Sequence, residues 1–195
     1  MLSKYFCQTL LDTPNYDIET AWVHADSSAK NFNNRTTQRK WLKLPANESL
    51  WSRDILNKFA TVNIKPYAVR LFKWEAGQLF RWHTDYGASA EAPYCVVNWI
   101  IEGAGLIEHN ENIQLHKHVD QLSFKMKESS ADDKVLSSTS GHGCLLDIYI
   151  PHRVNTINCC QPRVSIGIVW KTLSNAHLRF EDLRDRFKQI DLLDY

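Results

Sequence analysis

The apolar positions of this chain follow a helical period at two places, with a long strand-like region between them. Residues 48–62 have an apolar side chain every three or four positions, and Asn47 stands where a helix N-cap is expected. Residues 178–193 repeat the period, with charged side chains on the opposite face. The pattern predicts one helix before and one after a β-rich core. The tail helix either packs on its own domain or forms a contact between two copies of the chain.

Between the helices, short apolar runs separated by turn residues predict a series of strands. In chain order these are 67–74, 78–82, 93–101, 105–109, 121–126, 144–150, 154–157 and 163–170. The segment 128–143 is polar apart from Val135-Leu136, so we expect it to be mainly loop. Short strands flanked by helices favour a closed or sandwiched β-structure with a core over about 66–170. A single domain is expected over 1–195.

The first part of that domain, residues 1–65, is expected to be partly helical and partly extended. An amphipathic piece is predicted at 5–11, and short strands are predicted at 20–24 and 40–44. The segment 26–38 is rich in Asn, Ser and Thr and has no core pattern, so it is predicted to be a loop. This loop is either ordinary surface or a flap near a site.

Composition and charge exclude several classes of protein. The chain is 44% hydrophobic and 23% charged, as globular domains are, and its net charge of +1 gives no basic surface for nucleic acid or an anionic membrane. No apolar run is as long as a membrane-spanning helix, and residues 1–17 lack the pattern of a signal peptide. The five cysteines have no Cys-x-x-Cys spacing, which argues against disulfides or a thiolate zinc site and predicts a cytoplasmic location.

Candidate chemistry begins at the sequence Trp82-His83-Thr84-Asp85. Residues two apart in an extended segment point to the same side, so the His83 imidazole and the Asp85 carboxylate can meet at one point. A second imidazole, His152, follows an apolar strand and a proline bend. Two imidazoles and one carboxylate form a facial triad, which holds Fe(II) on one side and leaves three positions open. Each side chain alone is also compatible with a hydrogen-bonded core residue.

The last predicted strand adds a candidate anion site. Arg163 and Ser165 share one face of that strand by alternation, and Val164, Ile166 and Ile168 take the other. A buried arginine needs an anion, and this strand contains no acidic residue. The guanidinium fork binds a carboxylate with two parallel hydrogen bonds, so a small-molecule carboxylate is a suitable partner.

Together, His83-x-Asp85, His152 and Arg163-x-Ser165 resemble the motif of the Fe(II)- and 2-oxoglutarate-dependent dioxygenases. The resemblance implies a double-stranded β-helix, a cupin-like jelly roll. It also implies that His83, Asp85 and His152 bind Fe(II), and that Arg163, helped by Ser165, holds the C5 carboxylate of 2-oxoglutarate. The 2-oxo group and C1 carboxylate would take two iron positions and O2 the third. The products would be a hydroxylated substrate, succinate and CO2.

Three positions narrow the branch of the family that the chain resembles. Asp85 favours hydroxylation, because halogenating relatives lack this carboxylate. Val169 stands where nucleic-acid demethylases have a second arginine, six residues after the first. Collagen-type prolyl hydroxylases and histone demethylases often have lysine at the position of Arg163. The resemblance therefore points to branches that act on small molecules, free amino acids or peptidyl side chains.

Several other side chains are candidate site residues that each have an alternative structural role. Asn98 interrupts an apolar strand, and it contacts either the C1 carboxylate of 2-oxoglutarate, the substrate or a core partner. Arg70 either faces inward and binds a substrate carboxylate or is solvated, and Tyr86 is a candidate for the pocket wall. Asp147 is expected to be a structural carboxylate at a strand end. Three histidines without a recognised ligand spacing stand in a polar region: His109, His116 and His118.

The leading hypothesis from the sequence is an Fe(II)/2-oxoglutarate-dependent hydroxylase that acts on a small molecule, an amino acid or a peptide. Two other classes of function stay open. One is a cupin-like metal enzyme that does not use 2-oxoglutarate, such as an isomerase or a thiol oxidase. The other is a non-catalytic β-domain used for binding or assembly. A monomer and a homodimer formed through the C-terminal helix are both compatible with the sequence.

Overall fold

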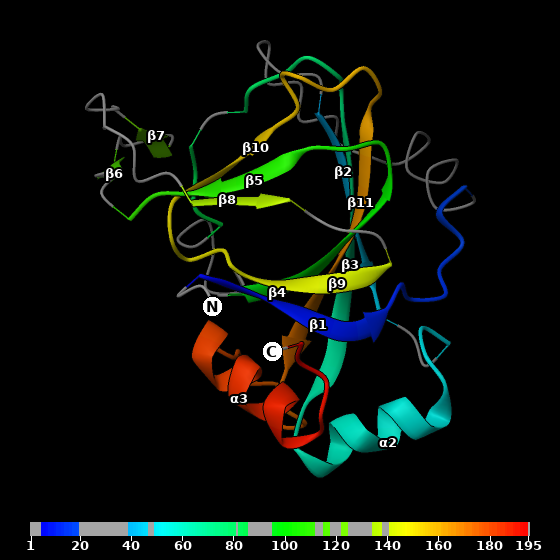
Figure 1. Ribbon diagram of the computed structural model, residues 1–195. Helices are drawn as coiled ribbons and strands as arrows, with labels where there is room; N and C mark the ends of the chain where they lie inside the picture. The colour runs from blue at the N-terminus through cyan, green and yellow to red at the C-terminus, as the bar shows by residue number, and fades with distance from the viewer. Residues whose placement is uncertain are drawn as a thin grey trace.

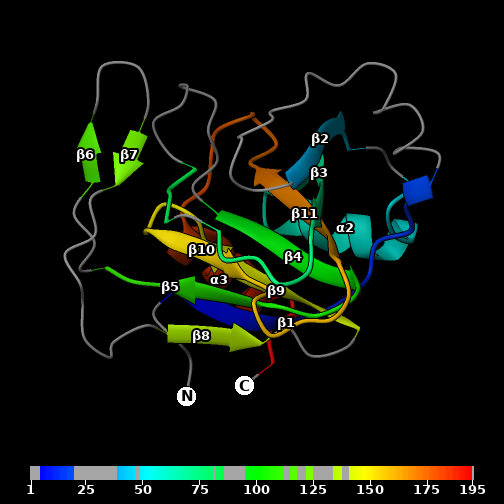
Figure 2. The ribbon, with the colours of Figure 1, turned by 90° about the horizontal axis from the view of Figure 1, so that it is seen from above.

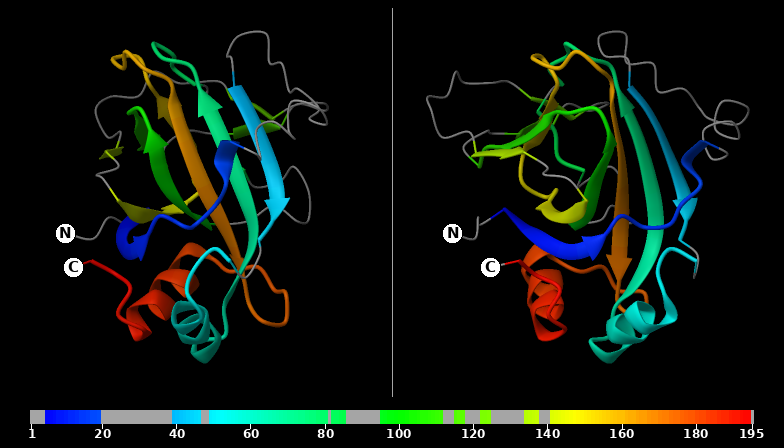
Figure 3. Two further views of the ribbon diagram at one scale, coloured as in Figure 1. Left: turned by 90° about the vertical axis from the view of Figure 1, so that its right-hand side faces the viewer. Right: turned by 45° about the vertical axis from the view of Figure 1, so that its right-hand side comes forward.

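In the part of the chain that the computed structural model describes, two antiparallel sheets, a separate two-stranded ribbon and two helices make up the fold (Figure 1). The structure describes residues 5–19, 39–46, 49–80, 82–85, 95–111, 115–117, 122–124, 134–137 and 141–194. Both helices lie at one end of the molecule, below the long strands of the larger sheet (Figure 3). Within the described residues, no helix combines the length and apolar character needed to cross a membrane.

Among the described residues, the larger sheet has six strands and the smaller has three. The order in the larger sheet is β1 (Phe6–Asp12), β9 (His142–Asp147), β4 (Cys95–Glu102), β11 (Arg163–Lys171), β3 (Lys65–Trp74) and β2 (Arg39–Pro45). The smaller sheet has β10 (His152–Asn155), β5 (Leu106–His109) and β8 (Lys134–Ser137), and β6 (Leu115–Lys117) pairs separately with β7 (Leu122–Phe124). Figure 2 shows the sheets from above, with β10, β5 and β8 apart from β11, β3 and β2.

The chain crosses repeatedly between the two sheets. From β3 it passes to the open edge of β10, where Leu79 pairs with Asn155 and His83 with His152. It then returns to the larger sheet as β4, forms β5 and β8 in the smaller sheet, and continues through β9, β10 and β11 in alternate sheets. This order is that of a double-stranded β-helix, or jelly roll, as the sequence predicted.

Alternation along β11 gives the larger sheet two different faces. Ile166, Ile168 and Trp170 are buried against the helices, whereas Arg163 and Ser165 line a cavity between the sheets. This is the division of faces predicted from the sequence. The apolar cluster between the sheets contains Trp74, Val96, Ile107, Cys144, Leu146, Ile148 and Val154. The catalytic candidates therefore lie in the inner core, and the helices stabilise the sheet from its other side.

Both helices are shorter than the sequence pattern suggested. Helix α2 (Arg53–Thr61) begins after Ser52, whose hydroxyl accepts a hydrogen bond from the Ile55 N–H at 3.4 Å. The predicted start near residue 48 was therefore wrong, because Ser52 provides the cap. Helix α3 (Phe180–Gln189) buries Leu183 and Phe187 within its own domain. An association between copies through this helix remains a prediction.

Three strand predictions differ from the structure. β8 forms in the segment predicted to be loop, because its four residues pair with β5. The N-terminal amphipathic piece is the edge strand β1, which pairs with β9. The predicted strand 78–82 is reduced to the two isolated bridges on β10. The predicted strand 20–24, the loop 26–38 and Tyr86 lie outside the described residues.

Candidate active site

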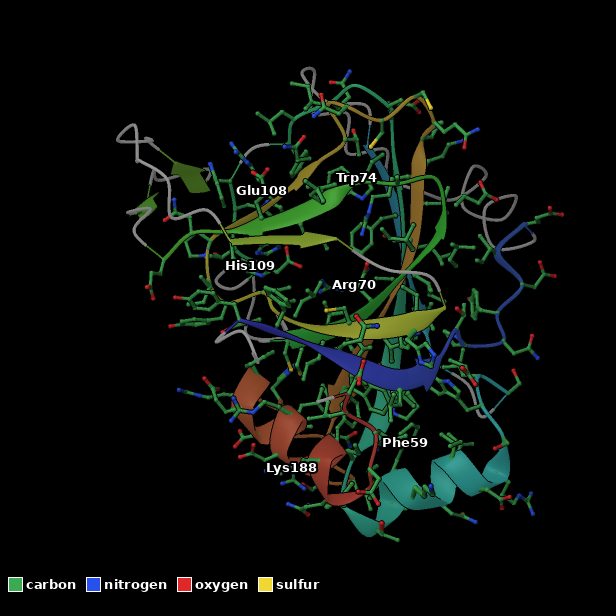
Figure 4. The ribbon with its side chains drawn as sticks, in the orientation of Figure 1. Phe59, Arg70, Trp74, Glu108, His109 and Lys188 are labelled. Carbon is green, nitrogen blue, oxygen red and sulfur yellow. The ribbon has the colours of Figure 1, made fainter. Side chains whose placement is uncertain are left out.

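One cavity between the sheets collects the predicted site residues that the structure describes. Seven of them line it: Arg70, His83, Asp85, Asn98, His152, Arg163 and Ser165. The remaining wall is apolar and comes from the inner faces of both sheets. In Figure 4, Arg70 and Trp74, both from β3, lie between the sheets. A mostly apolar cavity with a few converging polar groups is the usual form of a small-molecule site.

His83 and His152 are held opposite each other by the backbone. The His83 N–H donates to the His152 carbonyl at 2.9 Å, the His152 N–H donates to the His83 carbonyl at 2.8 Å, and the ring centroids lie 4.4 Å apart. The Asp85 N–H donates to the Ile148 carbonyl at 3.1 Å, which fixes the third residue. One ligand atom from each of the three side chains lies within 4.8 Å of the others. The sheet itself thus brings the predicted triad together.

The tautomer of His152 follows from its neighbour. Its Nδ1 lies 3.0 Å from the carbonyl oxygen of Ile150. A carbonyl can only accept, so Nδ1 bears the proton and donates, and in the neutral ring Nε2 carries the lone pair. Neutral imidazole nitrogens and a carboxylate oxygen are the donor set of non-haem Fe(II) sites, so these residues fit such an ion.

A set of contacts on the outer side of β10 holds His152 in place. Arg153 forms an ion pair with Glu108 of β5, and its guanidinium lies 4.4 Å from the ring centroid of Trp82. Asn155 donates to the same Glu108 carboxylate at 2.7 Å. These contacts tie β10 both to β5 and to the segment that carries His83. The sequence analysis assigned no role to Arg153 or Glu108, although their alternation with His152 and His109 places them on the outer face.

Arg163 is a fully buried cation with neutral partners. It is 1% exposed, and it donates to Ser165 Oγ and to Asn98 Oδ1, both at 3.0 Å. Burial lowers the pKa of its guanidinium to about 10, and its Nε has no partner among the described residues. A Cβ at Gly105 would lie 2.8 Å from Arg163 Cδ, so the glycine lets the chain cover the arginine stem. A buried cation of this kind is stabilised when an anion binds.

Arg70 faces inward, which decides between the two orientations considered from the sequence. Its Nη1 donates to Asp85 Oδ2 at 2.8 Å, and the two side chains are 15% and 22% exposed. The cavity therefore contains two guanidinium groups and one carboxylate among its described lining residues. A divalent cation at the triad would add to this positive charge, so the cavity favours an anionic ligand. A direct role of Arg70 in binding substrate remains a prediction.

His109 is a core residue. Its Nε2 donates to the Asp147 carbonyl at 3.2 Å, and its ring is stacked on Tyr5 at 6.0 Å. Burial, and then the neighbouring His152, lower the pKa of His109 to about 3, so its ring is neutral. The side chains of His116 and His118 lie outside the described residues, so a metal site shared by the three histidines remains untested.

Asp147 is the strand-end structural carboxylate that the sequence suggested, and it makes stability depend on pH. Its Oδ1 accepts from the Tyr149 N–H at 2.9 Å, and burial raises its carboxyl pKa from 3.8 to about 6. Between these values the folded protein keeps a proton that the unfolded chain has lost. The free energy of unfolding therefore falls as pH rises through this window.

Asp147→Asn should remove this pH dependence, because the amide oxygen still accepts from Tyr149 but carries no charge. Near pH 7 we expect the variant to be more stable than the native protein by about 1 to 2 kcal/mol, with little difference near pH 4. Urea unfolding at both pH values measures the change. A stability difference that is the same at both would contradict the assignment.

No family model and no curated protein matches this chain. The solved structures that resemble it include the following three. The non-heme monooxygenase ThoJ in a nickel complex is 13% identical, with a TM-score of 0.48 over 95% of this chain and 96% of its own. A Pseudomonas putida prolyl-4-hydroxylase is 9% identical, with a TM-score of 0.45 over 84% and 91%. EvdMO1 is 14% identical, with a TM-score of 0.46 over 84% of this chain but 46% of its own.

The chain thus spans less than half the length of EvdMO1. At these identities and TM-scores the likenesses assign no activity to this chain. The jelly-roll fold rests on the strand order, and the candidate site rests on the side chains that converge in the cavity. In the residues that the structure describes, His83, Asp85 and His152 are the group able to hold a metal ion.

Proposed function

We propose that this protein is an Fe(II)- and 2-oxoglutarate-dependent oxygenase that hydroxylates a C–H bond of a small molecule, an amino acid or a peptidyl side chain. One observation carries the proposal. A single cavity contains a His–Asp–His donor group and a fully buried arginine whose hydrogen-bonded partners are neutral. The donor group supports a metal ion, and the arginine supports an organic anion bound beside it.

Each part of the cavity has a role in this proposal. His83, Asp85 and His152 would hold Fe(II), and Arg163, with the two side chains paired to it, would bind the distal carboxylate of 2-oxoglutarate. Fe(II), 2-oxoglutarate and O2 together supply the oxidation of a C–H bond, with release of succinate and CO2. The apolar wall contributed by both sheets would exclude water from the reacting groups.

Succinate formation tests the proposal directly. The purified protein is incubated with Fe(II), 2-oxoglutarate and O2, with and without a panel of free amino acids and short peptides. We expect succinate to form slowly without substrate, faster with the right substrate, and not at all without Fe(II). In the absence of O2, Fe(II) with 2-oxoglutarate should also give a visible metal-to-ligand charge-transfer band.

Other results would favour the alternative functions. Tight metal binding with neither succinate nor the absorption band would indicate a cupin-like metal enzyme that does not use 2-oxoglutarate. Affinity for neither Fe(II) nor 2-oxoglutarate, measured by thermal shift, would indicate a non-catalytic binding domain. Either result would overturn the proposed activity.

A further inference from the structure

The two oxygens of the Asp85 carboxylate have different surroundings. Oδ1 lies 3.7 Å from His83 Nε2. Oδ2 accepts a hydrogen bond from Arg70 Nη1 at 2.8 Å. Oδ1 thus lies on the side of the histidines, while Oδ2 is bound to a guanidinium group.

The larger sheet fixes Arg70 in this position. Arg70 of β3 pairs with Gly167 of β11, which in turn pairs with Asn98 of β4. A Cβ at Gly167 would lie 3.1 Å from Val96 Cγ2 and 3.5 Å from Asn98 Nδ2, so there is little free space beside this glycine between the paired strands. The Arg70 Nε has no hydrogen-bond partner among the described residues, and the ion pair with Asp85 is made through Nη1.

We propose that Arg70 is a positioning residue that restricts Asp85 to one metal-binding oxygen. A carboxylate can bind a metal through one oxygen or through both. Because Arg70 holds Oδ2, the ion would receive only Oδ1, and the position that Oδ2 would otherwise fill stays open for the co-substrate. The inference rests on the proposed metal site and concerns a residue outside the triad.

An arginine beside a metal ligand affects metal affinity and chelator affinity in opposite directions. A guanidinium beside a metal ligand competes with the ion for the carboxylate charge and repels the ion itself. Removing the Arg70 charge should therefore leave metal affinity unchanged or increase it. At the same time, the freed Oδ2 would occupy an open position and weaken the binding of a chelating ligand. A residue needed only for folding would lower both affinities.

Arg70→Met keeps the length of the side chain but removes its charge and donors. Mn(II) serves as the probe, because water-proton relaxation reports how many water molecules a bound Mn(II) retains. We expect Mn(II) to bind the variant as tightly as the native protein or up to about tenfold more tightly. Relaxivity per bound ion should fall by about one third, since a facial triad leaves three of six positions to water. The affinity of the Mn(II)-loaded protein for 2-oxoglutarate should fall at least about tenfold.

Two further variants make the test specific. Arg184→Met makes the same exchange on the surface of α3, and it should change neither affinity nor relaxivity. Arg70→Lys keeps a charge and a donor, so it should restore relaxivity toward the native value. If Arg70→Met does not fold, Arg70→Lys and Arg70→Ala replace it in the test. Arg70→Lys should then retain native relaxivity, and Arg70→Ala should lower it.

The possible failures can be told apart. If the native protein binds no Mn(II), the proposed metal site fails, and the role of Arg70 fails with it. If the native protein binds Mn(II) and Arg70→Met has native relaxivity and native 2-oxoglutarate affinity, only the role of Arg70 is overturned. Loss of Mn(II) binding together with a lower melting temperature in the variant would also overturn it, because Arg70 would then be a structural residue.

Discussion

Replacing His152 with alanine should lower the affinity for Fe(II) or Co(II) by more than about 100-fold and abolish succinate formation. Changes outside the first ligand shell of a metal site already cost about 10- to 100-fold, and this change removes a ligand. Because Nδ1 contacts the Ile150 carbonyl, the lone pair of the neutral ring lies on Nε2, the nitrogen that would bind the metal. The variant would retain only His83 and Asp85, two donors from one short segment. Isothermal titration of the metal-free protein with Co(II) measures the effect.

His142→Ala is the matched control for this experiment. His142 is exposed at the start of β9, outside the cavity-lining residues. The control should bind Co(II) as the native protein does. Equal metal affinity in His152→Ala and the native protein would remove His152 from the site. Because the His83–His152 bridge consists of backbone bonds, alanine preserves it, and loss of the fold is not expected.

Replacing Arg163 with methionine should weaken 2-oxoglutarate binding by about 30- to 5,000-fold while leaving metal binding intact. Breaking one partner of a buried, hydrogen-bonded charge pair costs about 2 to 5 kcal/mol, which corresponds to this range. Arg163 has no carboxylate partner among the described residues, so in the free protein its charge is balanced only by neutral dipoles. Methionine fills similar space without the cost of burying a charge.

The same exchange at Lys171 controls for loss of a cation from β11. Lys171 lies at the other end of the strand, where its Nζ is 3.7 Å from the ring centroid of Tyr67. Titration of 2-oxoglutarate into the Mn(II)-loaded proteins should separate the two variants. Melting temperatures without ligand show whether each variant is folded. Native affinity in a folded Arg163→Met protein would place the anion site elsewhere.

The site was predictable wherever a local rule applied. Alternation placed His83 with Asp85 and Arg163 with Ser165, and the structure keeps both pairs on one face. The lack of an acid on the last strand pointed to a small-molecule carboxylate as the partner of Arg163, and the structure gives Arg163 neutral hydrogen-bond partners. Contacts between strands depend on register, which no short stretch of sequence specifies. The Asn98–Arg163 hydrogen bond and the Arg70–Asp85 ion pair belong to this second class.

The errors in predicting the fold have the same origin. β8 has only four residues, which are too few for a periodic pattern. It forms because it pairs with the edge of β5. The segment before His83 has the composition of a strand but pairs with β10 only at single residues. The start of α2 was predicted too early because the apolar spacing includes Trp51. The helix begins only after Ser52, whose extended backbone and side chain form the N-cap.

The reciprocal backbone bonds between His83 and His152 also determine when the proposed metal centre could form during folding. The two histidines lie far apart in the chain, and their bridge joins the segment after β3 to β10. A nascent or partly folded chain offers His83 and Asp85 alone. The third proposed ligand, His152, joins them only when this long-range pairing forms, which is a late step for contacts of high sequence separation. Metal uptake during refolding would then show when the segment around His83 has paired with β10, and bound metal would slow the unfolding of this pairing.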